Sequence, residues 1–305
     1  MNQKDADLYN MQTLLNTVKG LPARKMVVVS PYDRATLESI SAAHNEDIIM
    51  PILIGEEKRI RRSAEQYNIP VNNMEIICSD EENIIERASS LLLEGKAHFI
   101  MKGMVRTGYF FHVLLDPRFK IRTERILSHV GMFEITEKKR IFLMSDAAIN
   151  ILPNFTRKIH IVANAVDAAH KLGIGHVKVA MLAALERVKL PAMPATLDAF
   201  LMKKFAETGY FERCEIDGPF AFDNALDPEK ARTKGIGGDV AGNANIIIVP
   251  NIETGNVLYK SITCIQRQDA AGVVLGGTCP IVLTSRSDDF KTKLNSIKFA
   301  RLLIL

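Results

Sequence analysis

The fold class is indicated by residues 26–54, which read MVVVSPYDRATLESISAAHNEDIIMPILI. The apolar runs Met26–Val29 and Ile49–Ile54 have the length of buried strands. The segment Arg34–Asn45 between them has apolar residues at helical spacing. A strand, a helix and a strand in this order are typical of a β-α-β unit in a parallel sheet.

This rhythm continues along the chain, so we predict an α/β fold around a mainly parallel sheet. Further strands are expected at Met74–Cys78, Ala97–Met101, Ile141–Met144, Val177–Leu182, Ile246–Val249, Ala271–Leu275 and Ile281–Leu283. Further helices are expected at Glu81–Glu94, Thr156–Leu172, Ala195–Glu207, Thr254–Gln268 and Asp288–Arg301.

The length and composition describe a folded protein of two domains. The chain has 305 residues, about twice the roughly 150 that are typical of one domain. Hydrophobic residues make up 47% and charged residues 24%, which excludes disorder as the main state. The charged segment Thr136–Arg140 lies between periodic segments and is the expected hinge, and a second crossing is expected near Leu283.

The cysteines, the chain's start and the charge favour a cytoplasmic protein. Cys78, Cys214, Cys264 and Cys279 lack the spacing of a zinc site or a disulfide scaffold. Residues 1–10 lack the basic and apolar regions of a signal peptide, and no apolar run approaches the roughly 18 residues of a membrane span. The net charge of +4 is scattered along the chain, so we expect no nucleic-acid partner and no membrane partner.

A glycine-rich loop at residues 235–242 has two interpretations. It leads into a predicted strand and no GK[ST] sequence follows, so it is not a Walker loop. It is either a turn that ends a helix at Lys234 or a place where a ligand approaches the backbone closely. No histidine or cysteine cluster has metal-ligand spacing and no GxSxG elbow is present, so we expect no bound metal.

Polar loops follow two predicted strands, at the end where ligands bind in open α/β folds. The first follows Ile246–Val249 and reads Pro250-Asn251-Ile252-Glu253-Thr254-Gly255-Asn256. Asn256 and Lys260 lie four residues apart and share one face of the helix that follows. Either they bind a ligand, or Asn251 or Thr254 caps a helix on which Lys260 is solvated.

The second loop follows Ile281–Leu283 and reads Thr284-Ser285-Arg286-Ser287-Asp288-Asp289. A helix N-terminus with an adjacent arginine is suited to binding an anion. In this loop a hydroxyl can hold a thiol, a guanidinium can neutralise a phosphate and a carboxylate can accept a proton. Serine and aspartate are also the preferred capping residues, so a plain helix start is the alternative.

Together the motifs resemble the phosphate acetyl/butyryltransferase family, most closely its phosphate butyryltransferase branch. Several motifs in order, from Ala97 to the C-terminus, are far more specific than any one of them. The residues that carry the resemblance are Met101-Lys102-Gly103, Ser128-His129-Val130, Asp146-Ala147-Ala148-Ile149-Asn150, Asp217-Gly218-Pro219, Asp223-Asn224-Ala225, Val240-Ala241-Gly242, residues 250–260 and residues 280–286.

The resemblance implies a two-domain α/β/α sandwich similar to isocitrate and isopropylmalate dehydrogenases, with an interdomain cleft and a homo-oligomer, usually a dimer. In that family the last helix rejoins the first domain, so we expect one domain at residues 1–139 and 283–305 and another at 140–282. The implied reaction is reversible transfer of a short acyl group, butyryl first, between coenzyme A and inorganic phosphate. Acyl-CoA, phosphate and acyl phosphate are then the partners, coenzyme A is a substrate, and no cofactor is tightly bound.

The resemblance also implies roles for particular residues. Ser285 would orient the thiol of coenzyme A, and Arg286 would neutralise phosphate and stabilise the transition state. Asp288 or Asp289 would accept the thiol proton, because a free thiol with a pKa of about 8.5 is only slightly ionised at neutral pH. The expected substrate-binding residues are Lys102, Arg106, Arg125, His129, Asn224, Asn256 and Lys260.

The chain departs from the family pattern at two informative positions. His112 stands where the family commonly has an arginine, and a histidine cannot hold phosphate bidentately. Arg106 and Arg125 are the candidate replacements, and Thr292 stands where the acetyltransferase branch has its acidic residue. Two alternatives follow. One is a phosphate acetyltransferase, since a methylene or two discriminates by only about 1–3 kcal/mol, and the other is a non-catalytic or regulatory acyl-CoA-binding protein.

Overall fold

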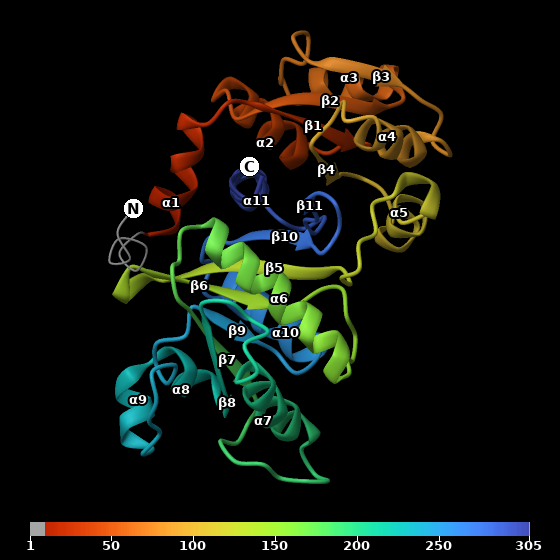
Figure 1. The fold of residues 1–305 in the computed structure, drawn as a ribbon. Helices are drawn as coiled ribbons and strands as arrows, with labels where there is room; N and C mark the ends of the chain where they lie inside the picture. The colour runs from red at the N-terminus through yellow and green to blue at the C-terminus, as the bar shows by residue number, and fades with distance from the viewer. Residues whose placement is uncertain (1–9, 305) are drawn as a thin grey trace. The chain divides into compact units, whose positions relative to one another are not determined.

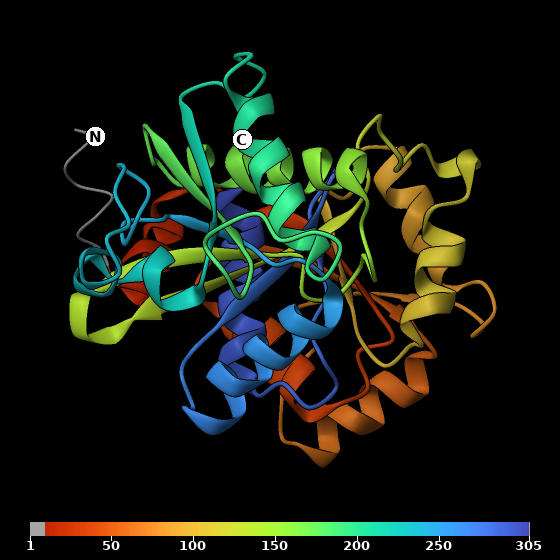
Figure 2. The same ribbon diagram turned by 90° about the horizontal axis from the view of Figure 1, so that it is seen from below.

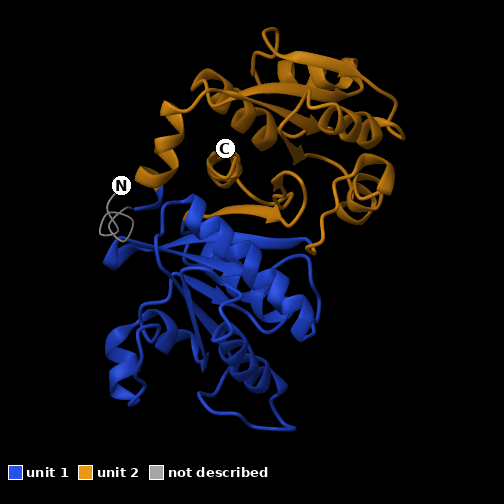
Figure 3. Cartoon of the chain, viewed as in Figure 1, with its two compact units in different colours: residues 1–11, 127–268 blue, residues 12–126, 269–305 orange. Residues whose placement is uncertain are grey.

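The computed structural model describes residues 10–304, which form two compact units (Figure 3). Among the described residues, unit 1 comprises residues 10–11 and Leu127–Gln268, and unit 2 comprises Gln12–Ile126 and residues 269–304. The mixed α/β fold that the sequence predicts is confirmed (Figure 1). Among the described residues, none of the helices is both long and apolar enough to cross a membrane.

The units divide at different residues from those expected, 1–139 with 283–305 and 140–282. The expected hinge at Thr136–Arg140 begins with a 3-10 turn, η4 (Thr136–Lys138), between the antiparallel strands β5 (Ser128–Ile135) and β6 (Arg140–Ser145) of unit 1. A charged, exposed turn of a hairpin has the same composition as a linker, which is why the two were not distinguished. The second crossing lies earlier than Leu283, because β10 (Ala271–Leu275) and β11 (Ile281–Val282) both belong to unit 2.

The strands of unit 2 run in the order β3-β2-β1-β4-β11-β10. Apart from β10, which is antiparallel to β11, all neighbours in this series are parallel. The strands not yet given are β1 (Arg24–Val29), β2 (Ile49–Gly55), β3 (Glu75–Cys78) and β4 (Phe99–Lys102). The helices are α1 (Met11–Asn16), η2 (Thr17–Gly20), α2 (Arg34–Asn45), α3 (Glu57–Gln66), α4 (Ile84–Leu93), α5 (Thr107–Leu114), η3 (Pro117–Phe119) and α11 (Phe290–Leu302).

The centre of unit 2 is the strand β1, in which Met26–Val29 are completely buried. A strand covered by helices on both faces reads as a continuous apolar run, and this accounts for the MVVV sequence. The helix α2 follows β1, and the Asp33 carboxylate caps it by accepting a hydrogen bond from the Thr36 backbone N–H (2.9 Å). Helix α2 packs on α11, so a helix near the start of the chain and the last helix are neighbours in unit 2.

The strands of unit 1 run in the order β5-β6-β9-β7-β8, and all pairs except β5 with β6 are parallel. The helices α6 and α10 lie on opposite faces of this sheet (Figure 2). The remaining strands are β7 (Val177–Leu182), β8 (Cys214–Phe220) and β9 (Ile246–Ile248). The helices are α6 (Phe155–Lys171), α7 (Pro194–Ala206), α8 (Phe222–Leu226), α9 (Pro228–Thr233), α10 (Ile252–Lys260) and the π-helical turn η5 (Ser261–Ile265).

Candidate active site

Three loops of unit 2 meet at one edge of its sheet. The strands β1, β4 and β11 are parallel neighbours, so their carboxyl ends lie side by side. The loops that leave them are residues 30–33, 103–106 and 283–289. The loop after β4 carries the Met101-Lys102-Gly103 motif, and the loop after β11 carries Ser285 and Arg286.

Gly103 brings the first two of these loops into backbone contact. A Cβ atom at this position would lie 2.4 Å from the Ser30 carbonyl oxygen and 2.5 Å from the Val29 carbonyl oxygen. These oxygens accept hydrogen bonds from the Met104 and Gly103 backbone N–H groups, both at 2.9 Å. Glycine is therefore required at position 103 because backbone occupies the space of a side chain.

Lys102, the last residue of β4, is a buried cation with a side chain 4% exposed. Its ammonium donates hydrogen bonds to the carbonyl oxygens of Gly103 and Val105, both at 3.1 Å. Burial, first, and the positive charges of Lys293 and Arg286 together lower the pKa of Lys102 from 10.5 to about 8. The Asp33 carboxylate acts in the opposite direction.

Lys293, in the first turns of α11, is a second buried cation beside the first. It is 3% exposed, and its ammonium donates to the Thr284 hydroxyl (3.1 Å) and to the Ser285 carbonyl oxygen (3.2 Å). Burial lowers the pKa of Lys293 as well. Within the described residues, the hydrogen bonds of Lys102 and Lys293 go only to uncharged oxygen atoms.

The Ser285–Asp288 loop is held by its own side chains. The Asp288 carboxylate accepts a hydrogen bond from the Ser285 backbone N–H (2.8 Å), and the Ser285 and Ser287 hydroxyls are 3.0 Å apart. Asp289 caps α11 by accepting from the Thr292 N–H (2.8 Å), so the capped helix start and the polar cluster are both present. Ser285 and Arg286 are exposed.

A second polar turn, in unit 1, follows the strand β6. The Asp146 carboxylate is 2% exposed and accepts hydrogen bonds from the backbone N–H groups of Ala148, Ile149 and Asn150 at 2.9–3.1 Å. It also accepts from the Asn150 side-chain amide at 2.6 Å, and the Asn150 oxygen accepts from Arg157 at 2.6 Å. A carboxylate with this many donors holds the shape of the turn.

The same turn packs against the Pro250–Lys260 motif. A Cβ at Gly255 would lie 2.8 Å from the Ala147 Cα atom, so the first turn of α10 contacts the backbone of residues 146–147. The Asn251 side chain caps α10 by accepting from the Thr254 N–H (2.9 Å), as the capping interpretation predicts. Asn256 is exposed on α10, and the Lys260 ammonium lies 5.5 Å from the centre of the Tyr259 ring.

His129 lies in this part of unit 1. Its side chain is 4% exposed, and its ring contacts the Tyr259 ring edge-on with centres 5.8 Å apart. Asn224 lies elsewhere, on α8 after β8, completely buried, with its side-chain N–H donating to Glu186. The carbonyl oxygen of the Asn224 side chain has no hydrogen-bond partner among the described residues.

The glycine-rich loop is explained by the chain's own backbone. Helix α9 ends at Thr233, and Gly235 follows with φ of +69°, as the helix-ending interpretation predicts. Gly242 has φ of +76°, and a Cβ there would lie 2.4 Å from the Pro228 Cα atom. The close backbone approach at residue 242 is therefore to α9 of the same unit.

The predicted site residues fall into groups by unit. Unit 2 brings Lys102 and Arg286 within electrostatic range of each other, and Ser285 and Asp288 into hydrogen-bond contact. Unit 1 brings His129 and Lys260 to the same tyrosine, Tyr259. The remaining predicted residues have other surroundings: Arg106 is exposed before α5, Arg125 is half-buried after Thr123, Asn224 lies near Glu186, and Asn256 is exposed on α10.

Sequence reasoning missed Lys293 and Asp33. The available signal for Lys293 was its position in α11, because Lys293, Ile297 and Ala300 lie on one face of the helix and that face is buried. A lysine on the apolar stripe of a helix is unusual enough to be noted. The sequence around Asp33 indicates a helix cap and gives no sign of its nearness to the two lysines.

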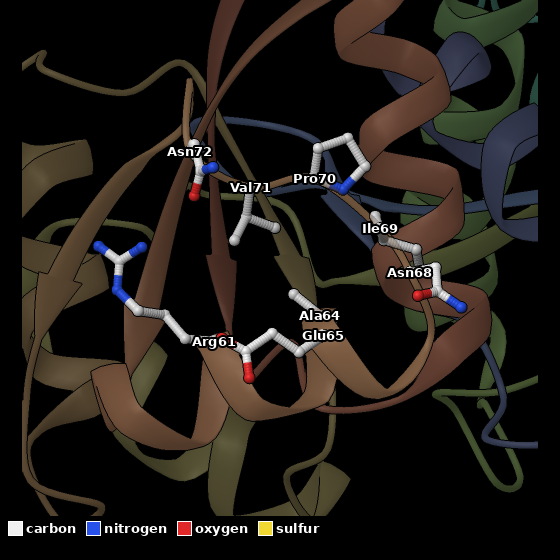
Figure 4. A pocket seen from close by; sticks show the side chains of 8 residues that line it. All are labelled: Arg61, Ala64, Glu65, Asn68, Ile69, Pro70, Val71 and Asn72. Atoms are coloured by element: carbon white, nitrogen blue, oxygen red, sulfur yellow. The ribbon is translucent and has the colours of Figure 1, made fainter.

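A cavity of about 570 Å³ lies apart from these groups, at the end of α3 in unit 2 (Figure 4). The charge of Arg61 in its wall is compensated by Glu57 (2.8 Å). None of the predicted site residues lines it, and no group of three or more metal-ligating side chains exists among residues 10–304. The cavity lining consists of Arg61, Ala64, Glu65, Asn68, Ile69, Pro70, Val71 and Asn72.

A cluster of cations and hydroxyls at the carboxyl ends of parallel strands is typical of α/β proteins that act on phosphate-bearing substrates. Residues 80–300 match the model of the phosphate acetyl/butaryl transferase family, so the chain belongs to that family.

Relatives of known name agree with this assignment. The chain is 37% identical to the phosphate butyryltransferase of Clostridium beijerinckii over 96% of this chain and 97% of that protein. It is 38% identical to the phosphate acetyltransferase of Rhizobium meliloti, over 90% of this chain and 87% of that protein. A crystal structure of a branched-chain phosphotransacylase from Enterococcus faecalis V583 is similar with a TM-score of 0.81 at 30% identity, covering 92% of this chain and 99% of that one.

Proposed function

We propose that this protein transfers a short acyl group, butyryl in the first place, between coenzyme A and inorganic phosphate. The observation that carries the proposal is the Ser285–Arg286 loop beside the buried ammonium groups of Lys102 and Lys293. Family membership supplies the reaction class, and coenzyme A takes part as a substrate.

The loop supplies the groups that the reaction needs. The sulfur of coenzyme A attacks the carbonyl carbon of the acyl phosphate, the carbon–sulfur bond forms, and the carbon–oxygen bond to phosphate breaks with its electron pair on the phosphate. The Ser285 hydroxyl orients the thiol, and Arg286 with the lysines stabilises the charge on the leaving phosphate. The thiol proton passes to Asp288, whose carboxylate contacts the Ser285 backbone. Thioester and phosphate react by the reverse path.

The remaining substrate-binding residues of the proposal are Arg106 and Arg125 in unit 2 and His129, Asn224, Asn256 and Lys260 in unit 1. The buried His129 ring and the Lys260 ammonium, both against Tyr259, support a role for that group in holding coenzyme A. The unsatisfied oxygen of Asn224 supports a polar ligand or a water there.

Three finer statements belong to the proposal. An isocitrate dehydrogenase-like arrangement of two domains is supported by the two compact α/β units. A homo-oligomer is supported by exposed apolar side chains of unit 1, namely Val188 and Leu190 before α7 and Phe200 and Leu201 on it. A cytoplasmic location is supported by cysteines without disulfide partners, Cys78, Cys214, Cys264 and Cys279.

The test is release of free thiol from butyryl-CoA and acetyl-CoA by the purified protein, with and without phosphate. Arg286→Ala should lower the rate by about 10²–10³-fold, because it removes a charged donor to the transition state. Arg62→Ala, at an exposed arginine of α3, is the matched control and should leave the rate unchanged. Phosphate-dependent turnover that persists in full in Arg286→Ala would contradict the mechanism.

Two observations support the alternative functions, a phosphate acetyltransferase and a non-catalytic binder, so the assay must test these as well. Relatives named phosphate acetyltransferase make the acetyl group the second candidate, and a chain-length series of acyl-CoA substrates decides between them. Thr292, whose backbone N–H donates to Asp289, offers no carboxylate, which favours a non-catalytic binder. A binder would hold coenzyme A without turnover, and His112→Arg would then restore a large rate.

A further inference from the structure

Two of the buried lysines in the described chain lack a carboxylate partner. Lys158 lies 2.6 Å from an Asp198 oxygen, and Lys298 lies 3.0 Å from a Glu46 oxygen. Lys102 and Lys293 are buried to the same degree, yet they bond only to carbonyl oxygens and a hydroxyl. Buried charges are normally paired, so these two call for an anion that the chain does not supply.

The arrangement of the two ammonium groups fits an anion with several oxygens. Each ammonium has three N–H donors and uses two of them within the described residues. One donor therefore remains on each lysine. Both lie at the carboxyl ends of β4 and β11, and Arg286, which follows β11, adds a third positive charge within electrostatic range of Lys102.

The acidic groups nearby attract these lysines but, within the described residues, form no hydrogen bond with either ammonium group. Asp33 attracts both lysines, but its carboxylate is engaged as the cap of α2. Asp288 and Asp289 act on Lys293, and each is bound to a backbone N–H of its own loop. The cluster is therefore suited to an anionic ligand.

We propose that Lys102 and Lys293 together bind the oxygens of phosphate and of the phosphoryl group of acyl phosphate, and that Arg286 binds beside them. This assignment rests on the proposed function. Under this assignment the positive charge for the anion comes from β4 and α11, whereas α5 has His112 at the position of the family arginine. Lys293 also ties the anion to the catalytic loop, because the same ammonium holds Thr284 and the Ser285 carbonyl oxygen.

Binding should take up protons. Burial and the neighbouring cations hold the pKa of Lys102 at about 8 in the free protein, and a bound dianion opposes both effects and raises it. With a pKa of about 8, part of Lys102 is unprotonated at pH 8 before binding, so the protein should take up a fraction of a proton for each dianion that it binds. Affinity for the dianion should fall as the pH rises above 8.

The first experiment uses the wild-type protein and titration calorimetry at pH 8, in two buffers of different ionisation enthalpy. Sulfate is the principal probe because it does not titrate near pH 8, and inorganic phosphate is the second. Proton uptake with both anions is expected. Binding of sulfate without proton uptake, or no binding of either anion at millimolar concentrations, would overturn the proposal.

The second experiment compares Lys102→Met and Lys293→Met with Lys291→Met, whose exposed ammonium pairs with Asp269 on the surface. Each buried substitution should weaken phosphate binding about 10- to 100-fold, the value of a lost hydrogen bond from a charged group, whereas Lys291→Met should change it by less than about twofold. The buried variants should unfold at the wild-type temperature or above it in phosphate-free buffer, because an unpaired buried charge is removed.

Turnover distinguishes failure of this proposal from failure of the proposed function. A wild-type enzyme with phosphate-dependent turnover, and lysine variants that bind phosphate normally, would refute the lysine pair and keep the transferase. A wild-type protein without turnover that still shows lysine-dependent anion binding would refute the transferase and keep the anion site.

Discussion

The contact at Gly103 makes a sharp prediction, because the space of a side chain there is filled by backbone. In Gly103→Ala the new Cβ would lie 2.4 Å from the Ser30 oxygen, 2.5 Å from the Val29 oxygen and 2.9 Å from the Ser30 carbonyl carbon. No side-chain rotation relieves contacts with backbone, so the loops after β1 and β4 must separate. Overpacking of this kind costs about 1–3 kcal/mol, and we expect the upper end because the displaced oxygens also accept hydrogen bonds.

The control lies five residues further along, in the same segment. At Gly108, within α5, a Cβ meets nothing within 4 Å, so Gly108→Ala should stabilise the protein by up to about 1 kcal/mol through helix propensity. The two alanine substitutions therefore have opposite signs in urea unfolding followed by circular dichroism. Phosphate binding should also weaken in Gly103→Ala, because the Gly103 oxygen positions Lys102. Equal unfolding midpoints for the two variants would refute the close approach.

Three further predictions concern charged groups. The pKa of Lys102 is about 8 in the folded protein and about 10.5 in the unfolded chain, so the unfolded chain binds more protons between these two pH values. The free energy of unfolding in phosphate-free buffer should therefore rise by up to about 3 kcal/mol from pH 8 to 10.5. Lys102→Met should remove this rise. Asp288→Asn keeps an acceptor for the Ser285 N–H but cannot take a proton, so turnover should fall about 10²–10⁴-fold with unchanged thermal stability, and full turnover would exclude Asp288 as the base. Asp146→Ala removes the acceptor of four donors, two of which are buried on Asn150. The substitution should cost about 3 kcal/mol in urea unfolding, and a loss below about 1 kcal/mol would show that the turn does not depend on this carboxylate.

Elements with a strong local signal were predicted from the sequence. The helix α2 begins and ends at the predicted residues, since Asp33 caps it and its buried side chains follow helical spacing. The strands β7 and β10 also begin and end at the predicted residues, because both are mostly buried and apolar, with Lys178 the one charged residue in β7. The strands β5 and β8 were not expected, since β5 contains polar residues and a glycine within a buried segment and β8 contains Gly218 and Pro219. Proline is tolerated in β8 because this strand ends the order of the sheet.

The sequence predicts those site residues that lie at the end of a strand or in the loop after it. Lys102 ends β4, and Ser285 and Arg286 lie in the loop after β11, so sequence order alone places them at one edge of a parallel sheet. Lys293 was not predictable in this way, because its burial results from the packing of α11 on α2 and β10. The residues around position 293 indicate neither that Lys293 lacks a carboxylate partner nor that it lies near Lys102.

The choice of lysine over arginine follows from what the cluster must do when no anion is bound. An arginine stays protonated at any ordinary pH, so a guanidinium in place of Lys102 would keep its full repulsion with Arg286 and Lys293 in the free protein. A buried lysine can release a proton, as the pKa of about 8 at Lys102 indicates. The free site can therefore lower its own charge, and when phosphate binds, the lysine regains its charge by taking up a proton from the solvent. The cost of this arrangement is that the affinity for phosphate depends on pH near 8, a dependence that an arginine in place of His112 would not have introduced.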